Sequence, residues 1–306
     1  MAAGEVGSRT NQVFGGENLK RQKVLRFLLK ALAALLVLGL VLVGVLFVYM
    51  QRINKSYKIE FYQLTSEKLN SNLRIVYLTD LHLHEYGDGN SELLSDIEKL
   101  APDLILSGGD MVIYSEEDYS SMIDFTEKLS KIAPLYGVLG NHESEKIYMD
   151  GDSELVSRFE EAGMHFLRYE DTTIEINGDQ IQLVGISGTS GGFTEYGGSD
   201  EMDSLEDSDC YRIVMAHVPI IFADHLVNYD FDLGLAGHTH GGLVRIPKIG
   251  GLYSSEEGFL PEYSGGLYDL SNGAKLIISR GLGDSAKIPI RVYSSHELSV
   301  IDINKY

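Results

Sequence analysis

Cysteine and basic side chains are scarce in this 306-residue chain, and both shortages restrict what it can be. The single cysteine, Cys210, excludes an intramolecular disulfide and a structural zinc site built from several thiolates. Lysine and arginine number 25 against 45 aspartates and glutamates, a formal net charge of −20 at pH 7. Residues 59–306 carry 16 basic and 43 acidic side chains. Such an acidic segment does not offer nucleic acid a phosphate-neutralising surface, so we expect no nucleic-acid partner.

Internal repeats and a Walker-type phosphate loop are also absent from the sequence. The glycine-rich stretch GGLVRIPKIGG at 241–251 is not followed by the Gly-Lys-Ser/Thr that such a loop needs. Beyond the apolar amino-terminal stretch, about 250 residues remain, enough for two domains but more in keeping with one large α/β domain with its own core.

Polar residues of the metal-binding type end several apolar runs. These runs are rich in aliphatic and β-branched residues, which is typical of buried strands: IVYLTD, LILSGGD, LYGVLGN, IVMAHVP and LGLAGHTH. The carboxyl ends of strands are where ligand sites form in α/β sheets. Burying so many unpaired carboxylates and imidazoles would be costly unless a cation drew them together. The pattern therefore predicts a metal centre.

Seven side chains are the candidate ligands: Asp80, His82, Asp110, Asn141, His217, His238 and His240. Oxygen and imidazole ligands suit Mn²⁺, Fe or Zn²⁺. Seven ligands are too many for one tetrahedral ion, but they suffice for two ions about 3.5–4 Å apart if one carboxylate bridges them. Because paired metals clamp phosphate oxygens and acidify a bridging water, the ligand set predicts two divalent metal ions and phosphoryl hydrolysis.

The order of these motifs resembles that of the calcineurin-like metallophosphoesterases, whose pattern is D-x-H, G-D, G-N-H-[DE], H and G-H-x-H. The matching blocks are Asp80-Leu81-His82, Gly109-Asp110, Gly140-Asn141-His142-Glu143, His217 and Gly237-His238-Thr239-His240. The resemblance extends over residues 70–303. It is strongest to the membrane-anchored or exported bacterial branch, because GHTHGG leads into LVRIPKIGGLYSSEEGFLPEYSGGLY and then LIISRGLGDSAKIPIRV.

This resemblance implies a fold and a set of roles. The fold is α/β, with two packed mixed β-sheets flanked by helices and the metals on loops at strand ends. One metal would take Asp80, His82 and His240, the other Asn141, His217 and His238, with Asp110 bridging them. His142 would face the phosphate and protonate the leaving oxygen or stabilise its charge. A metal-bridging hydroxide would attack phosphorus, in a phosphodiesterase or phosphomonoesterase reaction.

Residues 31–50 form a run of twenty positions without a charge, ALAALLVLGLVLVGVLFVYM. At 1.5 Å per residue such a helix spans the hydrocarbon layer of about 30 Å. A signal peptide is the competing interpretation, but its apolar part is normally shorter and ends at a small-x-small cleavage site. No polar face interrupts the run, which argues against a core helix. We therefore expect an uncleaved, single-pass transmembrane helix.

Basic residues flank this run unequally. Five lie close before it and three close after it: Lys20, Arg21, Lys23, Arg26 and Lys30, then Arg52, Lys55 and Lys58. The positive-inside rule places the amino terminus in the cytoplasm and the catalytic domain outside the cell membrane. We expect a basic cytoplasmic segment (1–30), the transmembrane helix (31–50), a juxtamembrane segment with the first strand (51–69) and the metallophosphoesterase domain (70–306). Within the first of these, the polar, glycine-containing residues 1–20 predict no regular structure. A site close to lipid makes a membrane-associated, lipid-linked phosphoester a candidate substrate.

Two other functions stay open. One is a metal-binding sensor or binding module with the same fold and little turnover, against which the complete ligand set argues. The other is a metallohydrolase of an amide or a lactone, although Asn141 and His142 suit the charge of a phosphate better. The segment 188–209 is either a solvated surface loop or a lid in which Phe193 and Tyr196 meet the substrate.

Local patterns predict several further elements. Apolar residues on one face indicate a helix that begins at Asn90 or Ser91 and ends before Pro102, and another at 116–132. A third helix at 154–162 would end at Gly163. The stretches TTIEI and QIQLVGI surround Asn177-Gly178, which predicts a β-hairpin.

Overall fold

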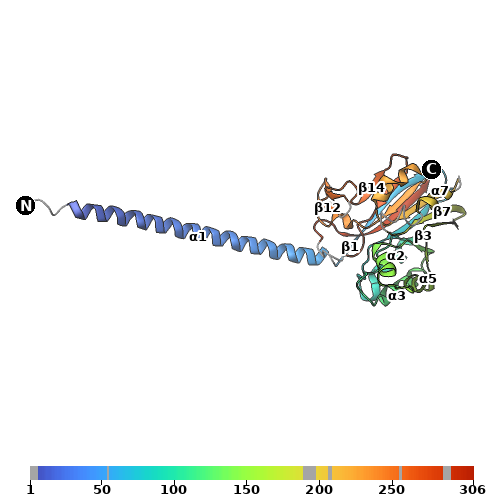
Figure 1. Ribbon diagram of the computed structural model, residues 1–306, viewed down its shortest axis with the longest axis horizontal. Coiled ribbons are helices and arrows are strands. Elements are labelled where there is room, and N and C mark those ends of the chain that lie inside the picture. The colour runs from blue at the N-terminus through green and yellow to red at the C-terminus, as the bar shows by residue number, and fades with distance from the viewer. Residues whose placement is uncertain (1–5, 54, 189–197, 206–208, 255–256, 285–290) are drawn as a thin grey trace, which may run out of the picture. The chain divides into compact units, whose positions relative to one another are not determined.

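The computed structural model describes residues 6–53, 55–188, 198–205, 209–254, 257–284 and 291–306. The chain divides into two compact units, residues 1–52 and 53–306. All the strands that the structure describes belong to the second unit (Figure 1).

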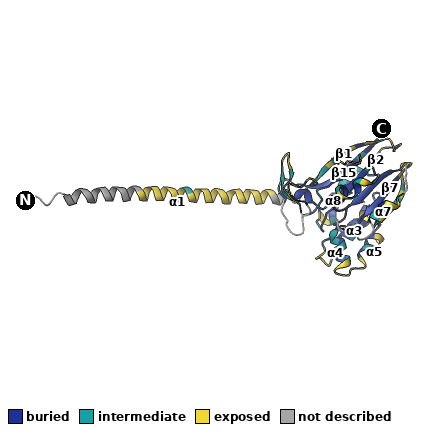
Figure 2. Cartoon of the chain, turned by 45° about the horizontal axis from the view of Figure 1, so that its top comes forward, coloured by how far each residue is buried: buried dark blue, intermediate teal, exposed yellow. Residues whose placement is uncertain are grey.

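The first unit is a single helix, α1 (Val6–Ile53), of 48 residues. Its segment Arg21–Tyr49 is long and apolar enough to cross a membrane, and all its residues except the half-buried Ala31 are exposed (Figure 2). At 1.5 Å per residue, 29 residues cover about 43 Å, more than the hydrocarbon layer. A signal sequence near an amino terminus meets the same criteria of length and composition. Because α1 begins at Val6, the prediction that residues 1–20 lack regular structure is wrong from there on.

Six strands form the first sheet of the second unit, in the spatial order β1-β16-β2-β3-β4-β5. Their bounds are β1 (Tyr57–Ser66), β16 (His296–Lys305), β2 (Leu73–Leu78), β3 (Leu104–Ser107), β4 (Leu135–Gly137) and β5 (Met164–Phe166). Strands β2 to β5 are parallel to one another. Strand β16 is antiparallel to β2 and parallel to β1, so the sheet is mixed. Every residue of β3 is buried, as expected for a strand with both faces covered.

Six further strands form the second sheet, in the order β14-β15-β9-β8-β7-β6. Their bounds are β14 (Gly266–Asp269), β15 (Lys275–Ile278), β9 (Leu233–Ala236), β8 (Tyr211–Ala216), β7 (Asp179–Ile186) and β6 (Glu170–Ile176). The four central strands are parallel, and β14 and β6 are antiparallel edges. Strands β6 and β7 are the predicted hairpin: Ile176 pairs with Asp179, and Asn177 and Gly178 have φ values of 53° and 86°. Two consecutive positive φ angles are those of a type I′ turn.

The two sheets pack face to face over a shared apolar core. Tyr77 and Leu106 of the first sheet and Leu183, Met215 and Leu235 of the second belong to this core. The other face of the first sheet packs against α2 (Ser91–Leu100), α3 (Ser120–Leu129) and α5 (Leu155–Glu161), which gather on one side of the unit in Figure 1. The other face of the second sheet packs against α7 (Gly198–Ser204) and α8 (Ile220–Asp224). The predicted fold class, two packed mixed sheets flanked by helices, is confirmed.

The remaining elements are short. They are α4 (Asn141–Tyr148), the 3-10 helices at Asp88–Asn90, Leu226–Asn228 and His240–Gly242, and the hairpins β10 (Arg245–Ile246) with β11 (Gly250–Gly251) and β12 (Tyr253–Ser254) with β13 (Gly258–Phe259). The helix predicted to begin at Asn90 or Ser91 and to end before Pro102 is α2, whereas α3 is shorter than the predicted 116–132. In the segment 188–209, residues 198–204 form α7, and both Phe193 and Tyr196 lie outside the described residues.

Candidate metal centre

The seven predicted ligands follow five parallel strands of the two sheets. Asp80 and Asp110 come after β2 and β3, Asn141 begins α4 after β4, and His217 directly follows β8. His238 and His240 come after β9. Because the two sheets pack face to face, these five strand ends meet at one edge of the sandwich. The structure brings all seven side chains to this edge.

The backbone is unusual at most of these positions. Five of the seven predicted ligands have a positive φ: Asp80 (53°), His82 (49°), Asp110 (53°), His238 (69°) and His240 (49°). Residues other than glycine populate this region sparsely, although aspartate and histidine do so more often than most, and each one held there costs on the order of 1–3 kcal/mol. Strain of this kind persists only where the surroundings hold it in place, and it gathers at functional sites.

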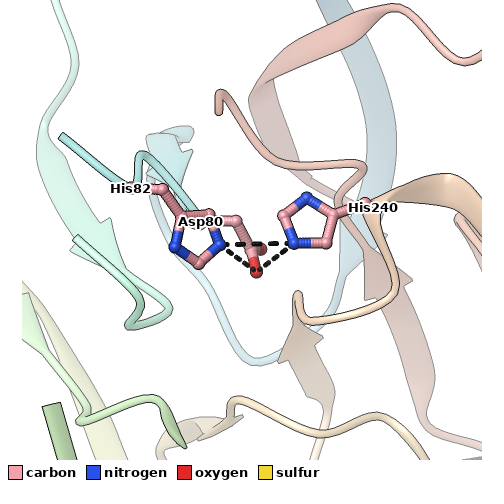
Figure 3. A group of neighbouring side chains, drawn as sticks. All are labelled: Asp80, His82 and His240. Carbon is pink, nitrogen blue, oxygen red and sulfur yellow. Dashed lines mark hydrogen bonds and ion pairs between the residues drawn. The ribbon is translucent and has the colours of Figure 1, made fainter. Parts of the chain in front are cut away.

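The first group of side chains is Asp80, His82 and His240, drawn in Figure 3. Their ligand atoms converge: Asp80 Oδ1 lies 4.0 Å from His82 Nε2 and 3.7 Å from His240 Nε2, and the two Nε2 atoms are 3.3 Å apart. All three residues are buried. An ion between these three atoms would have one oxygen and two imidazole ligands.

The second group is Asp110, His217 and His238. Asp110 Oδ2 is 3.2 Å from His217 Nε2 and also 3.8 Å from His82 Nε2 of the first group. One oxygen of Asp110 therefore faces a histidine of each group, as a bridging ligand would. Asn141 joins the second group, since its Oδ1 lies 3.0 Å from His238 Nδ1.

Two glycines of the motifs allow the carboxylates to come so close to the backbone. A Cβ at Gly140 would overlap Oδ1 of Asp110, and a Cβ at Gly237 would overlap Oδ2 of Asp80. The backbone N–H of His142 donates to Asp110 Oδ1 (2.8 Å), which leaves Oδ2 directed at the histidines. The glycine at each of these two positions is thus required by close approach.

Glu143 organises this region, a role that the sequence interpretation missed. Its buried carboxylate accepts four backbone N–H groups, from Asp110 (2.8 Å), Met111 (2.7 Å), Val112 (3.1 Å) and Gly140 (2.9 Å). It ties the loop after β3 to the loop after β4, and so fixes Asp110 relative to Asn141. The sequence does contain a signal for this role, because Glu143 is the last residue of the motif Gly-Asn-His-Glu.

His142 lies next to both groups without being one of the seven. It forms a third candidate cluster with His82 and Asp110, and its ring is 4.8 Å from that of His82. The backbone N–H of Tyr114 donates to His142 Nδ1 (3.0 Å). Because Nδ1 accepts a hydrogen bond, the neutral ring carries its proton on Nε2. Such a ring can donate that proton to a neighbouring oxygen.

Protonation differs among the buried histidines. Burial lowers the pKa of His82, and burial together with the charge of Arg291 lowers the pKa of His240 well below its usual value. Burial also lowers the pKa of His217, but the negative charges of Asp110 and Asp80 raise it overall to about 10. The two carboxylates thus favour a positive charge next to His217, which a bound cation would supply in place of a proton.

The residues fit a pair of divalent cations. His217 Nε2 is buried and lacks a hydrogen-bond partner among the described residues, and its Nδ1 donates to the carbonyl of Gly108 (2.7 Å). This bond orients Nε2 toward Asp110. Metal-binding histidines are commonly oriented in this way, by a hydrogen bond from the ring nitrogen that does not bind the metal. Two carboxylates buried together without a cation would be costly. Oxygen and imidazole donors suit Mn, Fe or Zn.

Arg291 affects how His240 of the first group can bind a cation. This fully buried side chain donates to His240 Nδ1 (2.9 Å) and to the carbonyl of Arg280 (2.7 Å). A guanidinium only donates, so Nδ1 is the acceptor and the neutral ring of His240 has its proton on Nε2. Binding of a cation by Nε2 would therefore require the proton to move to Nδ1 and Arg291 to release it.

Comparison with known proteins gives the family. The calcineurin-like phosphoesterase profile matches residues 73–242, which is more than half of the chain and includes every predicted ligand. The chain belongs to this family. It is 30% identical over 186 residues to the phosphodiesterase YaeI of Escherichia coli K12, covering 58% of this chain and 64% of YaeI. It is 27% identical over 255 residues to an uncharacterised metallophosphoesterase of Aquifex aeolicus, covering 80% of this chain and 91% of that protein.

Among solved structures, the chain is similar to a 5′-nucleotidase precursor from Thermus thermophilus. The identity is 14% and the TM-score 0.43, covering 76% of this chain and 54% of that one. The predicted membership of the metallophosphoesterases is confirmed by the family match. The roles given to the individual site residues stay predictions.

Proposed function

We propose that this member of the family is a metal-dependent phosphoester hydrolase with two divalent ions (Mn, Fe or Zn) at the candidate metal centre. One observation carries the proposal: a single oxygen of buried Asp110 faces His82 of one ligand group and His217 of the other. Two bound cations would acidify a water and neutralise the charge of the phosphate.

The protein side chains have separate parts in this reaction. His142 would donate the proton on Nε2 to the leaving oxygen, because its Nδ1 is held as an acceptor by Tyr114. Glu143 would keep Asp110 and Asn141 in place through its four backbone hydrogen bonds. Asp110 would hold both ions at their separation.

A phosphodiester is the substrate class that we favour over a monoester. The E. coli relative bears the name phosphodiesterase and is 30% identical to this chain over 186 residues. We propose further that α1 is retained as a membrane anchor, with the catalytic domain on the extracytoplasmic side. The five basic residues close before the apolar run, against the three close after it, support this orientation. A membrane-associated, lipid-linked phosphoester would then lie within reach.

The reaction class can be tested with chromogenic esters. The full chain in detergent should hydrolyse bis(4-nitrophenyl) phosphate when Mn²⁺, Zn²⁺ or Fe²⁺ is added and lose this activity to a chelator. 4-Nitrophenyl phosphate reports monoesterase activity and 4-nitrophenyl acetate reports hydrolysis of a carboxyl ester. Turnover of the acetate alone would show that the enzyme acts on another bond. Tight metal binding without any turnover would favour a sensor.

The anchor and its orientation need separate measurements. Amino-terminal sequencing of the membrane-bound protein should find α1 still attached, whereas a new terminus after residue 50 would show a cleaved signal peptide. A protease added outside intact cells should remove the domain of residues 70–306. Complete protection in intact cells, with digestion after lysis, would place the domain in the cytoplasm.

A further inference from the structure

A cavity of about 470 Å³ lies beside the candidate metal centre and is not used by the chemistry described above. Asn141, one of the predicted ligands, forms part of its wall. The volume falls within the range of about 300–1,000 Å³ that is usual for small-molecule sites. The cavity therefore adjoins the place where the phosphate would bind.

One face of α4 lines this cavity, beginning at Asn141 beside the metal centre. Its lining residues on that helix are Asn141, Ser144, Glu145 and Tyr148, spaced as i, i+3, i+4 and i+7. Residues at this spacing share one side of a helix. From Asn141 to Tyr148 the helix rises about 10 Å. A group attached to a phosphate at the metals would thus run along this face.

The opposite wall is firmly joined to the loop that carries Asn141. Ser187 Oγ accepts from the N–H of Leu139 (3.1 Å) and donates to the carbonyl of Leu167 (3.1 Å). The N–H of Gly188 donates to the carbonyl of Leu139 (2.9 Å), and the hydroxyl of Tyr169 donates to the carbonyl of Ser187. These bonds connect the ends of β4, β5 and β7, so the cavity has a preformed floor.

The outer part of the cavity exposes apolar side chains next to polar ones. Tyr148 is 67% exposed and Met149 is 79% exposed, although both are large and apolar. Beside them are the exposed side chains of Glu145, Arg168 and Glu170. An aromatic ring and a thioether favour a flat apolar face, while carboxylates accept hydrogen bonds from hydroxyl groups. Glu145 and Glu170 outnumber Arg168, so the net charge of these side chains disfavours a further anionic group.

From this arrangement we propose that the cavity binds the organic group of the phosphoester, and that this group is an uncharged ring bearing hydroxyls, such as a nucleoside or a sugar. The inference rests on the proposed phosphoester hydrolysis and adds the substrate class. The ring would stack on Tyr148, its hydroxyls would meet Glu145, and its phosphate would lie at the metals beyond Asn141.

Competitive inhibition measures the contribution of the ring separately from that of the phosphate. The reporter is metal-dependent hydrolysis of methyl 4-nitrophenyl phosphate by the full chain in detergent. The inhibitors are inorganic phosphate, ethyl phosphate, thymidine 5′-phosphate and glucose 6-phosphate. Ethyl phosphate carries the same ester without a ring. We expect thymidine 5′-phosphate, glucose 6-phosphate or both to inhibit at least tenfold more strongly than ethyl phosphate, the effect of one good stacking contact.

Variants then assign the preference to the cavity. Tyr148→Ala should remove the tenfold preference and leave inhibition by inorganic phosphate unchanged, whereas Tyr148→Phe should keep it. Tyr253→Ala, which removes a half-exposed tyrosine of the β12–β13 hairpin, is the matched control. A stronger effect of thymidine 5′-phosphate identifies the nucleoside as the ring, and a stronger effect of glucose 6-phosphate identifies the sugar.

Two results would overturn the inference without touching the reaction. One is equal inhibition by ethyl phosphate and both ring compounds in the wild type. The other is a preference for the ring compounds that survives Tyr148→Ala. Failure of the proposed function would look different, because the reporter would not be hydrolysed and inorganic phosphate would have no effect to measure.

Discussion

Replacing Glu143 by glutamine tests whether this side chain holds together the loops that carry Asp110 and Asn141. Each carboxylate oxygen accepts two backbone N–H groups: Oε1 those of Met111 and Val112, and Oε2 those of Asp110 and Gly140. A glutamine keeps one acceptor oxygen and turns an NH₂ group toward the other two donors. Those two N–H groups are then left buried without an acceptor.

The expected loss of stability follows from this count. A buried donor without a partner costs about 1–3 kcal/mol, so two cost about 2–6 kcal/mol. That is a large share of the roughly 5–15 kcal/mol that stabilises a typical protein. Because the loop carrying Asp110 also loosens, we expect metal affinity to fall by roughly 10–100-fold, as when other supporting partners of metal ligands are removed.

Urea unfolding of the chelated full chain in detergent measures the first effect. The near-ultraviolet circular dichroism of tyrosine reports on the catalytic domain, since the chain has no tryptophan and only Tyr49 of its 18 tyrosines belongs to residues 1–52. The control is Glu161→Gln, which changes an exposed glutamate at the end of α5 in the same way. Equal unfolding midpoints for the two variants would refute the role given to Glu143.

Two further predictions concern histidines. His142→Ala should lower turnover roughly 10²–10⁴-fold, as expected for loss of a proton donor, while metal content by mass spectrometry stays that of the wild type; loss of the metals would instead make His142 a ligand. Burial, opposed by Asp284 and reinforced by Arg291, lowers the pKa of His296 to about 4, against about 6.5 in an unfolded chain. The unfolded state therefore binds the proton more readily, so stability should be complete above about pH 6.5 and fall by up to about 3 kcal/mol as the pH decreases to about 4. The urea midpoint of His296→Gln should depend less on pH over this interval, and an unchanged dependence would contradict the assignment.

Much of the metal centre was predictable because two features of the sequence, polar motifs and apolar runs, coincide at its ligands. All but His217 belong to a short polar motif, and these motifs and His217 each end an apolar run. Parallel strands bring such ends to one edge, so Asp80 and His217 could be expected to meet although 136 positions separate them along the chain. The type I′ turn was likewise encoded locally, by Asn177 and Gly178.

Other features depend on contacts that no local pattern encodes. Helix α4 has only eight residues, NHESEKIY, without an apolar stripe, and it begins where Glu143 binds the N–H of Gly140. No motif in the sequence marks Arg291 as the buried arginine that contacts His240. Its position depends on the packing of the segment before β16 against the loop after β9. The cavity along α4 is formed by β4, β5 and β7 together, and only the assembled sheets show it.

The central claim is that one carboxylate, Asp110, holds two metal ions for phosphoester hydrolysis. Its most direct test is the metal content of the full chain purified without chelator, for the wild type and for Asp110→Asn. The account predicts about two divalent ions per wild-type chain, with metal-dependent turnover, and loss of ions from both positions in the variant. A wild-type chain that binds no metal under any supply of Mn²⁺, Zn²⁺ or Fe²⁺ would contradict it.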